Sequence, residues 1–187
     1  MVNVIDIKRV YDGWSKLSLA TVRGDDGRVF DRLIEDHGNA VCVLPVDRTR
    51  KVALLVRQFR TPVNLATGAA DFLEAIAGLT DGEAPQRAGM REAFEEAGVT
   101  LSAIEIVCEV WTMPGISTER MTLCVASYTK ADRTNDGGGN PSEHESIVVQ
   151  EMPLSELARL ADAGALSDMK TFALVQTVRL RDPDLFT

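Results

Sequence analysis

The chain has 187 residues, a length that favours one domain with a sizeable core or a small domain with an added arm. Apolar residues make up 45% of the chain and charged residues 26%, and no apolar run approaches bilayer-spanning length, so we expect no membrane partner. The net charge of −8 argues against nucleic acid as a partner, because phosphate contacts need clustered Lys and Arg.

Residues 1–10 mix charged with apolar side chains and lack the apolar core and cleavage site of a signal peptide, so we expect a cytoplasmic protein. Cys42, Cys108 and Cys124 are odd in number, widely spaced and set in apolar runs, which predicts buried reduced thiols. The sequence has no Cys-x-x-Cys pair, and its two histidines are far apart, so a zinc site is not expected.

The first predicted element is a β hairpin, with strands at residues 17–22 and 28–34 on either side of a turn rich in Gly and Asp. We expect it to form an N-terminal β arm over residues 1–38, followed by a main domain over residues 39–187. An isolated two-stranded hairpin is only marginally stable in water, so the arm needs a surface to pack on.

In the main domain, runs of apolar and β-branched residues predict strands at residues 41–44, 52–56, 104–110, 121–128 and 147–150. The first two of these strands are expected to form a second hairpin. Helices are predicted at residues 84–97 and 153–163, and from an Asp168 cap to residue 180. Strands and helices mix without a strict βαβ repeat, which indicates an α/β fold with a mixed sheet flanked by helices.

Residues 130–146 are polar, rich in glycine and long for a connection in a compact domain. Loops of this kind are usually functional or disordered. Two interpretations therefore remain open, a passive surface excursion and a mobile loop that brings its acidic residues to a ligand.

The helix predicted at residues 84–97 carries the most informative segment. At about a hundred degrees per residue, its apolar side chains gather on one face, and the opposite face holds Glu92, Glu95 and Glu96. Like charges at this spacing repel, and Gly98 ends the helix, so the carboxylates lie where the helix dipole favours cations. A solvated acidic face is the plain interpretation, but a divalent cation such as Mg²⁺ bound by Glu92 and Glu96 would reverse both penalties.

The segment from Gly78 to Val99 resembles the Nudix box, Gly-x5-Glu-x7-Arg-Glu-U-x-Glu-Glu-x-Gly-U, in which U is aliphatic. The matched positions are Arg91, Glu92, Glu95, Glu96, Gly98 and Val99. Only four residues separate Gly78 from Glu83, where the general pattern has five, so the match does not assign a role to Glu83. The resemblance implies a Nudix α/β/α sandwich that hydrolyses a nucleoside diphosphate linked to another moiety with the help of a divalent metal.

Three further segments, at residues 56–60, 137–139 and 166–171, resemble the GDP-mannose pyrophosphatase branch of this family. The branch implies a nucleotide-sugar substrate, with GDP-mannose giving GMP and mannose 1-phosphate. The closest alternative is ADP-ribose pyrophosphatase, which gives AMP and ribose 5-phosphate. A non-catalytic nucleotide-sugar sensor on the same fold is the alternative from another class.

The resemblance also implies the roles of individual residues. Mg²⁺, with Mn²⁺ as an alternative, is expected to be bound by the Ala77 carbonyl, Glu92, Glu96 and Glu145, with Glu95 in a second ligand set. Glu145 or its neighbour Glu143 would orient or deprotonate the attacking water, with Glu145 preferred, and Arg91 belongs to the same catalytic group.

Substrate contacts are implied for a second group of residues. Arg60 and Lys170 would bind phosphate or sugar, Trp14 would stack on the base and Glu119 would contact the sugar, and the same group includes Ala77, Gly78, Leu79 and His144. Each has a simpler alternative: a solvated arginine for Arg60, an anchor of the arm for Trp14, and a plain loop acid for Glu119.

The last expectation is a homodimer in which the arm of one subunit completes the substrate site of the other. In the branch that the sequence resembles, positions near Asp31, Arg32 and Leu33 contact the ligand of the partner. Arg32 would bring a cation to a site that the overall negative charge leaves short of them. The alternative is an arm folded back on its own subunit, with Arg32 solvated.

Overall fold

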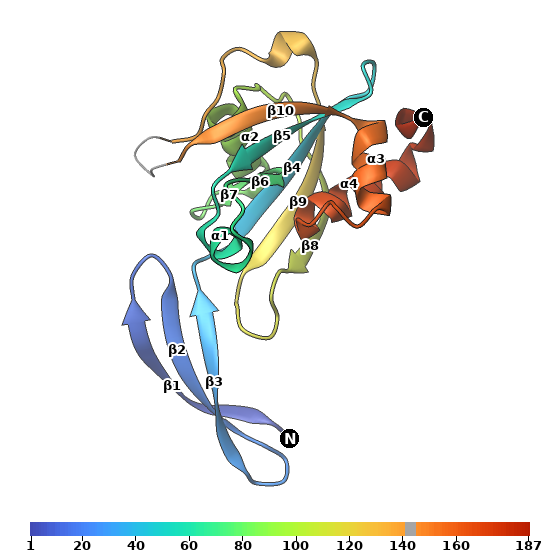
Figure 1. Ribbon diagram of the computed structural model, residues 1–187. Coiled ribbons are helices and arrows are strands. Elements are labelled where there is room, and N and C mark those ends of the chain that lie inside the picture. Colours follow the sequence, from blue (N-terminus) through green and yellow to red (C-terminus); the bar gives the residue numbers. More distant parts are fainter. Residues whose placement is uncertain (141–144) are drawn as a thin grey trace.

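A computed structural model describes residues 1–140 and 145–187. It consists of a main body with an N-terminal arm that extends away from it (Figure 1). In the described part of the chain, no helix is both long and apolar enough to span a bilayer.

The arm is a three-stranded antiparallel sheet of β1 (Asn3–Asp12), β2 (Lys16–Arg23) and β3 (Val29–Asp36) in that order. The predicted hairpin corresponds to β2 and β3 and is confirmed. Strand β1 was not predicted, because charges interrupt its apolar residues and every residue of the strand is exposed. The β1 strand gives the hairpin a third strand to pair with, but it does not give the arm a covered apolar face.

The main sheet has the strand order β10-β5-β4-β9-β8, formed by β4 (Ala40–Asp47), β5 (Val52–Gln58), β8 (Glu105–Trp111), β9 (Arg120–Ser127) and β10 (Ile147–Pro153). Strands β4 and β9 run parallel, whereas the other neighbours on this path are antiparallel, so the mixed sheet that the sequence predicts is confirmed.

The predicted second hairpin is only partly correct. Strands β4 and β5 pair over two positions, Val46 with Ala53 and Asp47 with Val52, and then separate. Two short strands that were not predicted, β6 (Phe72–Glu74) and β7 (Ile76–Leu79), take up the remaining edges, β6 along β5 and β7 along β4. This arrangement places Ala77 and Gly78 beside the central strand.

Helices cover both faces of the sheet, as expected for a three-layer sandwich (Figure 1). Helix α2 (Pro85–Ala97) packs on one face together with Val41 and Val43 of β4. Helices α3 (Leu154–Asp162) and α4 (Met169–Arg181) pack on the other face together with Cys42 and Leu44. The alternation of buried side chains along β4 therefore divides the core into two clusters.

The described part of the body also contains α1 (Thr61–Thr67) and the 3-10 helices η1 (Lys130–Asp132) and η3 (Pro183–Phe186). The predicted cap of the last helix is confirmed, because the Asp168 side chain accepts a hydrogen bond from the Thr171 backbone N–H at 3.1 Å. The prediction of buried thiols is confirmed for Cys42 and Cys124 but wrong for Cys108, which is exposed on the edge strand β8.

Candidate active site

A cavity of about 240 Å³ lies between β7, α2, the start of α4 and the base of the arm. A second cavity of about 790 Å³ adjoins it and shares Trp14, His37 and Arg60 with it. The structure brings most of the predicted site residues to the wall of the first cavity, namely Trp14, Arg60, Ala77, Gly78, Leu79, Arg91, Glu92, Glu95, Glu119, Glu145 and Lys170. Residues that are up to 156 positions apart in the sequence, such as Trp14 and Lys170, thus face one space.

The acidic face of α2 is not a solvated surface. Glu96 is 1% exposed, while Phe94, which the helical periodicity assigns to the packed face, is 47% exposed. The Glu96 carboxylate accepts a hydrogen bond from the Ala77 backbone N–H at 3.3 Å, which joins α2 to β7. The expected division into an apolar packed face and an exposed acidic face is therefore wrong for these two residues.

Burial and mutual repulsion make these carboxylates costly to ionise without a cation. Burial raises the pKa of Glu92 to about 7, and the charges of Glu95 and Glu145 add to the effect against the opposing influence of Arg91. Burial together with the charges of Glu92 and Glu145 also raises the pKa of Glu96 well above its usual range. Buried carboxylates that repel one another are suited to hold a hard divalent cation.

Arg91 is the cation that the chain itself supplies to this group. Its Nη1 lies 2.7 Å from a Glu92 oxygen and 3.3 Å from a Glu95 oxygen, and its Nη2 donates to the Leu79 carbonyl at 2.9 Å. Its Nε donates to Glu83 at 3.3 Å, so Glu83 has a place beside the box despite the shortened loop. Arg91 thereby links the helix to the loop that follows β7.

Two observations bear on whether the site fits a metal ion. A Cβ atom on Gly78 would lie 2.1 Å from the Glu92 carboxyl carbon, so the absence of a side chain at Gly78 lets that carboxylate approach β7. Among residues 1–140 and 145–187, no three His, Cys, Asp or Glu side chains already stand together at metal-binding distance. The donors at hand are carboxylate oxygens with raised pKa values, which fit Mg²⁺ once the Glu92 side chain turns from Arg91 to the ion.

The polar loop reaches the same site. The backbone N–H groups of Gly138 and Gly139 donate to the carbonyls of Glu96 and Glu95 at 2.9 and 3.1 Å, so the loop covers the end of α2. Glu145 lines the cavity, and its carboxylate accepts a hydrogen bond from the Asn140 backbone N–H at 2.8 Å. Glu145 thus needs no large movement to face Glu92, whereas the predicted residues Glu143 and His144 lie outside the described residues.

Arg60 and Lys170 share one buried acid that the sequence analysis did not select. Glu74 is 1% exposed, binds Arg60 through both carboxylate oxygens at 2.8 and 3.0 Å, and accepts from Lys170 Nζ at 2.6 Å. Burial alone would raise the pKa of Glu74, but the hydrogen bonds and charges of Arg60 and Lys170 outweigh burial and lower the pKa. The only sequence signal for Glu74 is an acid within a short apolar strand.

We expect Glu74→Gln to lower the free energy of unfolding by about 3 kcal/mol, because it leaves Lys170 buried with half of its neutralising charge removed. For a chain of this size the melting temperature should fall by roughly 10 °C. Thermal unfolding measures the effect, and Glu156→Gln serves as the matched control, since Glu156 forms an exposed pair with Arg159 on α3. A similar melting temperature for both variants would contradict the structural role of Glu74.

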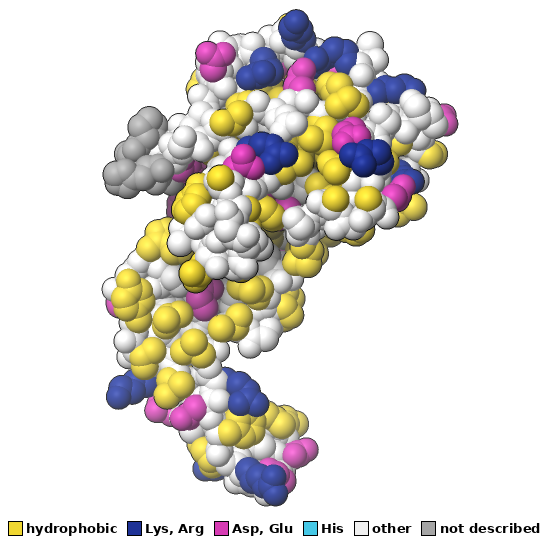
Figure 2. All heavy atoms as spheres, in the orientation of Figure 1, with side chains coloured by type: hydrophobic (Ala, Val, Ile, Leu, Met, Phe, Trp, Pro, Cys, Tyr) yellow, Lys and Arg dark blue, Asp and Glu magenta, His cyan; other side chains and the backbone are white. Residues whose placement is uncertain are grey.

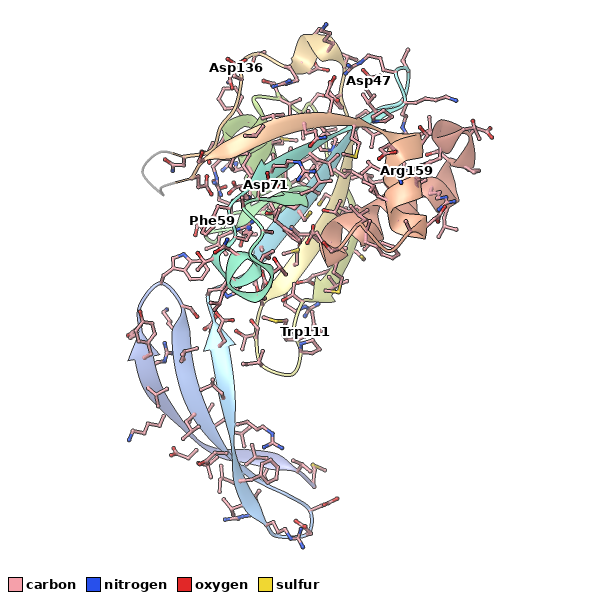
Figure 3. All side chains as sticks on the ribbon, in the orientation of Figure 1. Asp47, Phe59, Asp71, Trp111, Asp136 and Arg159 are labelled. Atoms are coloured by element: carbon pink, nitrogen blue, oxygen red, sulfur yellow. The ribbon has the colours of Figure 1, made fainter. Side chains whose placement is uncertain are left out.

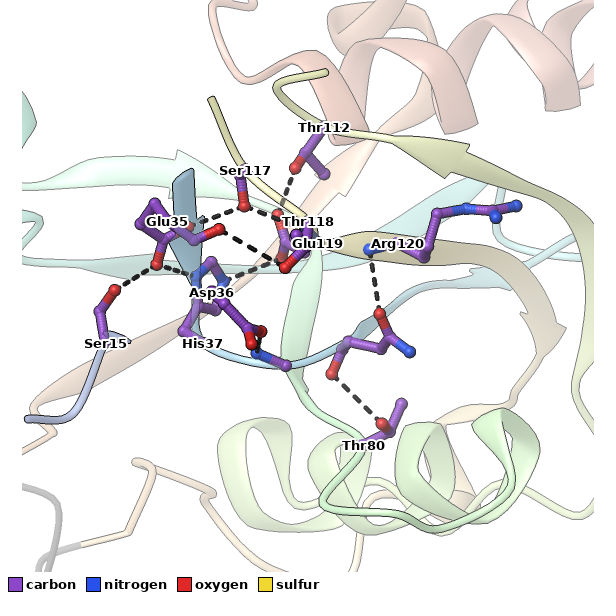
Figure 4. Close-up of polar contacts among 12 residues, drawn as sticks. Ser15, Glu35, Asp36, His37, Thr80, Thr112, Ser117, Thr118, Glu119 and Arg120 are labelled. Carbon is purple, nitrogen blue, oxygen red and sulfur yellow. Dashed lines mark hydrogen bonds and ion pairs between the residues drawn. The ribbon is translucent and has the colours of Figure 1, made fainter. Parts of the chain in front are cut away.

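Trp14 and Glu119 lie at the base of the arm, on either side of a residue that the sequence analysis did not select. His37 stacks on the Trp14 ring with centroids 5.2 Å apart. Figure 4 shows the other contact of His37, whose Nε2 lies 3.3 Å from a Glu119 oxygen. Trp14 thus lines the cavity while packing on a residue at the base of the arm, and its stacking on a base stays a prediction. Glu119 is not a plain loop acid, since it is 8% exposed.

Among the described residues predicted for the site, Glu96 does not line the cavity although its neighbours Glu92 and Glu95 do, and neither does Arg32. It lies in the middle of β3, its guanidinium stacks on Phe30 at 4.4 Å, and it donates to the Asp31 carbonyl at 3.0 Å. The arm extends away from the body and is not folded back along it (Figure 1). The structure of the single chain therefore does not bring Arg32 to the predicted substrate site.

Comparison with known proteins places this site in a family. The model of the NUDIX domain matches residues 36–174. A GDP-mannose pyrophosphatase of Cronobacter sakazakii is 41% identical over 160 residues, which cover 83% of this chain and 82% of that protein. A GDP-mannose pyrophosphatase of Pectobacterium atrosepticum is 31% identical over 185 residues, which cover 96% of this chain and 95% of that protein.

A solved structure, described as the crystal structure of an ADP compounds hydrolase, has the same architecture. It superposes with a TM-score of 0.76 over 98% of this chain and 95% of that chain, at 18% sequence identity. The match extends over the arm as well as the body, since it covers nearly the whole chain. At this identity the likeness supports the fold alone.

Proposed function

Since this chain belongs to the Nudix family, we propose that it hydrolyses the diphosphate of a nucleotide-sugar, with GDP-mannose as the preferred substrate, giving GMP and mannose 1-phosphate. One observation supports this most directly. Glu92 and Glu95 of α2 line one side of a cavity whose lining also holds the cations Arg60 and Lys170. The buried Glu96 lies one helical turn from Glu92 on the same helix. Cations stabilise a diphosphate, and on the glutamate side the cation that the described residues supply is Arg91, which already pairs with Glu92 and Glu95.

Nudix enzymes generally use a divalent metal, and in this chain the candidate ligands are Glu92, Glu96, the Ala77 carbonyl and Glu145, with Glu95 in a second set. Mg²⁺ suits these oxygen donors, and Mn²⁺ is the alternative. When bound, the metal would neutralise phosphate charge and lower the pKa of the attacking water. Glu145, or Glu143, would then orient that water or take its proton.

The shape of the joined cavities supports a substrate with two bulky ends. The second cavity is lined by Trp14 and Phe59, which are 77% and 54% exposed and offer aromatic faces to a base. Figure 3 shows Phe59 at the end of β5, on the side of the body nearest the arm. The first cavity adds Glu119, whose carboxylate suits sugar hydroxyl groups.

A small substrate panel tests the proposal. We expect the purified protein to release phosphomonoesters from GDP-mannose faster than from ADP-ribose with MgCl₂ present, and not at all with excess EDTA; a coupled phosphatase assay detects both products. Faster turnover of ADP-ribose would favour the ADP-ribose pyrophosphatase alternative. Binding without turnover in MgCl₂ would favour the sensor, against which the complete set of box glutamates counts.

The raised pKa values predict how stability depends on pH. Because the folded protein binds protons at Glu92 and Glu96 more tightly than the unfolded chain does, their ionisation makes unfolding easier as pH rises from about 4.5 through about 7. A cation that binds only the ionised carboxylates should therefore raise the melting temperature more at about pH 8 than at about pH 5.5. Melting curves with MgCl₂ and with EDTA at both values measure the difference. An equal shift at both pH values would contradict the assignment of these glutamates to the metal.

We infer that the active unit is a homodimer joined through the arm. Large apolar side chains on β1 are exposed, among them Val4, Ile7, Val10 and Tyr11, and Figure 2 shows hydrophobic side chains along the visible face of the arm. A three-stranded sheet with one strand exposed along its length gains a covered face by pairing with a second copy. Such pairing would also bring Arg32 to the partner's cavity. Light scattering of the purified protein gives the oligomeric state.

A further inference from the structure

A polar network joins the arm to the wall of the cavity (Figure 4). Its centre is His37, whose Nδ1 lies 2.6 Å from a Glu35 oxygen and whose Nε2 lies 3.3 Å from a Glu119 oxygen. Glu35 is fixed in turn by the hydroxyl groups of Ser15 and of Ser117, the latter at 2.7 Å. The network thus connects the turn after β1, the end of β3 and the segment before β9.

Both ring nitrogens of His37 face carboxylate oxygens, and this geometry selects a protonation state. A neutral imidazole carries one N–H, so one of the two carboxylates would face a lone pair. The imidazolium donates to both. Burial would lower the pKa of His37, but the hydrogen bonds and charges of Glu35 and Glu119 outweigh burial and raise it.

The flat side of the same ring supports Trp14. The two rings are stacked with an interplanar angle of 13°. Trp14 is 77% exposed, and both rings line the two joined cavities. A cation beneath the indole adds a cation–π attraction to the contact. His37 is therefore in contact with Glu119 through its edge and with Trp14 through its face.

We propose that His37 is a positioning residue which, as the imidazolium, holds the Glu119 carboxylate and the Trp14 ring in place as one wall of the substrate cavity. This inference rests on the proposed function, because it assigns the wall to the nucleotide-sugar. Substrate affinity then depends on the proton of His37, whereas the hydrolytic step at the α2 glutamates does not. The imidazolium also adds a positive charge beside a cavity that must accept an anion.

The charged groups that face His37 set the direction of the pH dependence. Glu35 from β3 and Glu119 from the segment before β9 both favour the proton. Arg60, Asp81 and Glu145 line the same cavities from the other elements. Because its pKa is raised, His37 keeps its proton to higher pH than an ordinary histidine does, and KM should rise as pH increases through that pKa.

A fluorescence titration tests, without any substrate, whether protonated His37 holds the Trp14 ring. The chain has two tryptophans, and Trp111→Phe leaves Trp14 as the single tryptophan, which is excited selectively over the two tyrosines. Because a protonated imidazole quenches a stacked indole, emission should increase in one step as pH rises through the raised pKa of His37. In the same background, His37→Gln should abolish the step. A step that persists in His37→Gln, or its absence in the Trp111→Phe protein, would overturn the proposal.

Kinetics test the consequence for the substrate. With MgCl₂ at about pH 6.5, His37→Gln should raise KM for GDP-mannose about tenfold, because one charge-assisted hydrogen bond is lost. The value of kcat should change less than about threefold. His37→Arg keeps the charge and a planar group, so its KM should be close to that of the wild type at this pH. Its KM should also lack the rise with pH that the wild type shows. An unchanged KM in His37→Gln, or an equal loss in both variants with melting temperatures like wild type, would overturn the proposal. If the wild type hydrolyses no nucleotide-sugar, the proposed function fails. The fluorescence step still shows whether protonated His37 holds Trp14.

Discussion

Replacing Glu96 by Gln is expected to lower kcat by roughly a hundredfold to ten-thousandfold while the protein stays folded. The carboxylate is 1% exposed, with Glu92 and Glu145 charges nearby, and the Gln side chain still accepts the hydrogen bond from the Ala77 N–H. The substitution removes the charge of one proposed metal ligand, and it also removes the repulsion of this carboxylate by Glu92 and Glu145. The melting temperature without metal should therefore stay the same or increase.

The measurements are MgCl₂-dependent hydrolysis of GDP-mannose and thermal unfolding of the purified variant. Glu105→Gln is the matched control, because Glu105 is exposed and pairs with Arg181 on the surface of the body at 2.8 Å. The control should keep wild-type activity. Full MgCl₂-dependent turnover in Glu96→Gln would refute the metal assignment, and a large loss of stability would show that Glu96 supports the fold.

Mixing two defective variants is expected to restore activity, measured at GDP-mannose well below the wild-type KM, if the arm acts on the partner. Arg32→Ala removes the cation of the arm, and we expect it to raise KM by roughly ten- to a hundredfold, whereas Glu96→Gln removes turnover. In a heterodimer, one cavity has an intact Glu96 and receives an intact Arg32. Random exchange makes half of the dimers mixed, with one intact site of two, so activity should reach about a quarter of wild type.

Subunit exchange is proven first with two differently tagged chains. Arg28→Ala is the matched control, since Arg28 is an exposed arginine in the turn between β2 and β3 whose ion pair is with Asp26. Its homodimer should be fully active. If exchange is complete and mixing restores nothing, then each arm serves its own chain or none, and the shared site is refuted.

The elements that the sequence predicted are those whose pattern is local. Helix α2 begins and ends within a residue of its expected bounds, because Pro85 and Gly98 mark its ends and one helical turn separates Glu92 from Glu96. Strands β6 and β7 have no such pattern, since they form only by pairing with β5 and β4. The face assignment of α2 failed because polarity was used as a sign of exposure, whereas the site requires Glu96 to be buried.

The candidate site shows the same contrast between residues with a local sequence pattern and residues placed by distant contacts. The box residues were found because they occupy one helix, and Arg60 and Lys170 were found through the resemblance. Glu74 and His37 were not found, because a partner that places each of them at the site is distant in the sequence: Lys170 is 96 residues from Glu74, and Glu119 is 82 residues from His37. A single acid in a strand and a single histidine at the end of another carry no spacing that predicts their role.

The pairing of β5 with β10 determines when the site can form during synthesis. Val52 pairs with Pro153, so the sheet closes across roughly one hundred residues, and contacts of such separation form slowly. Glu145 immediately precedes β10, and Lys170 follows it on α4. A nascent chain can fold α2 long before either residue leaves the ribosome. During synthesis, the glutamates of the box are therefore exposed before the loop with Glu145 and the Lys170 cation are available. Hydrolytic activity can begin only when nearly the whole chain has emerged.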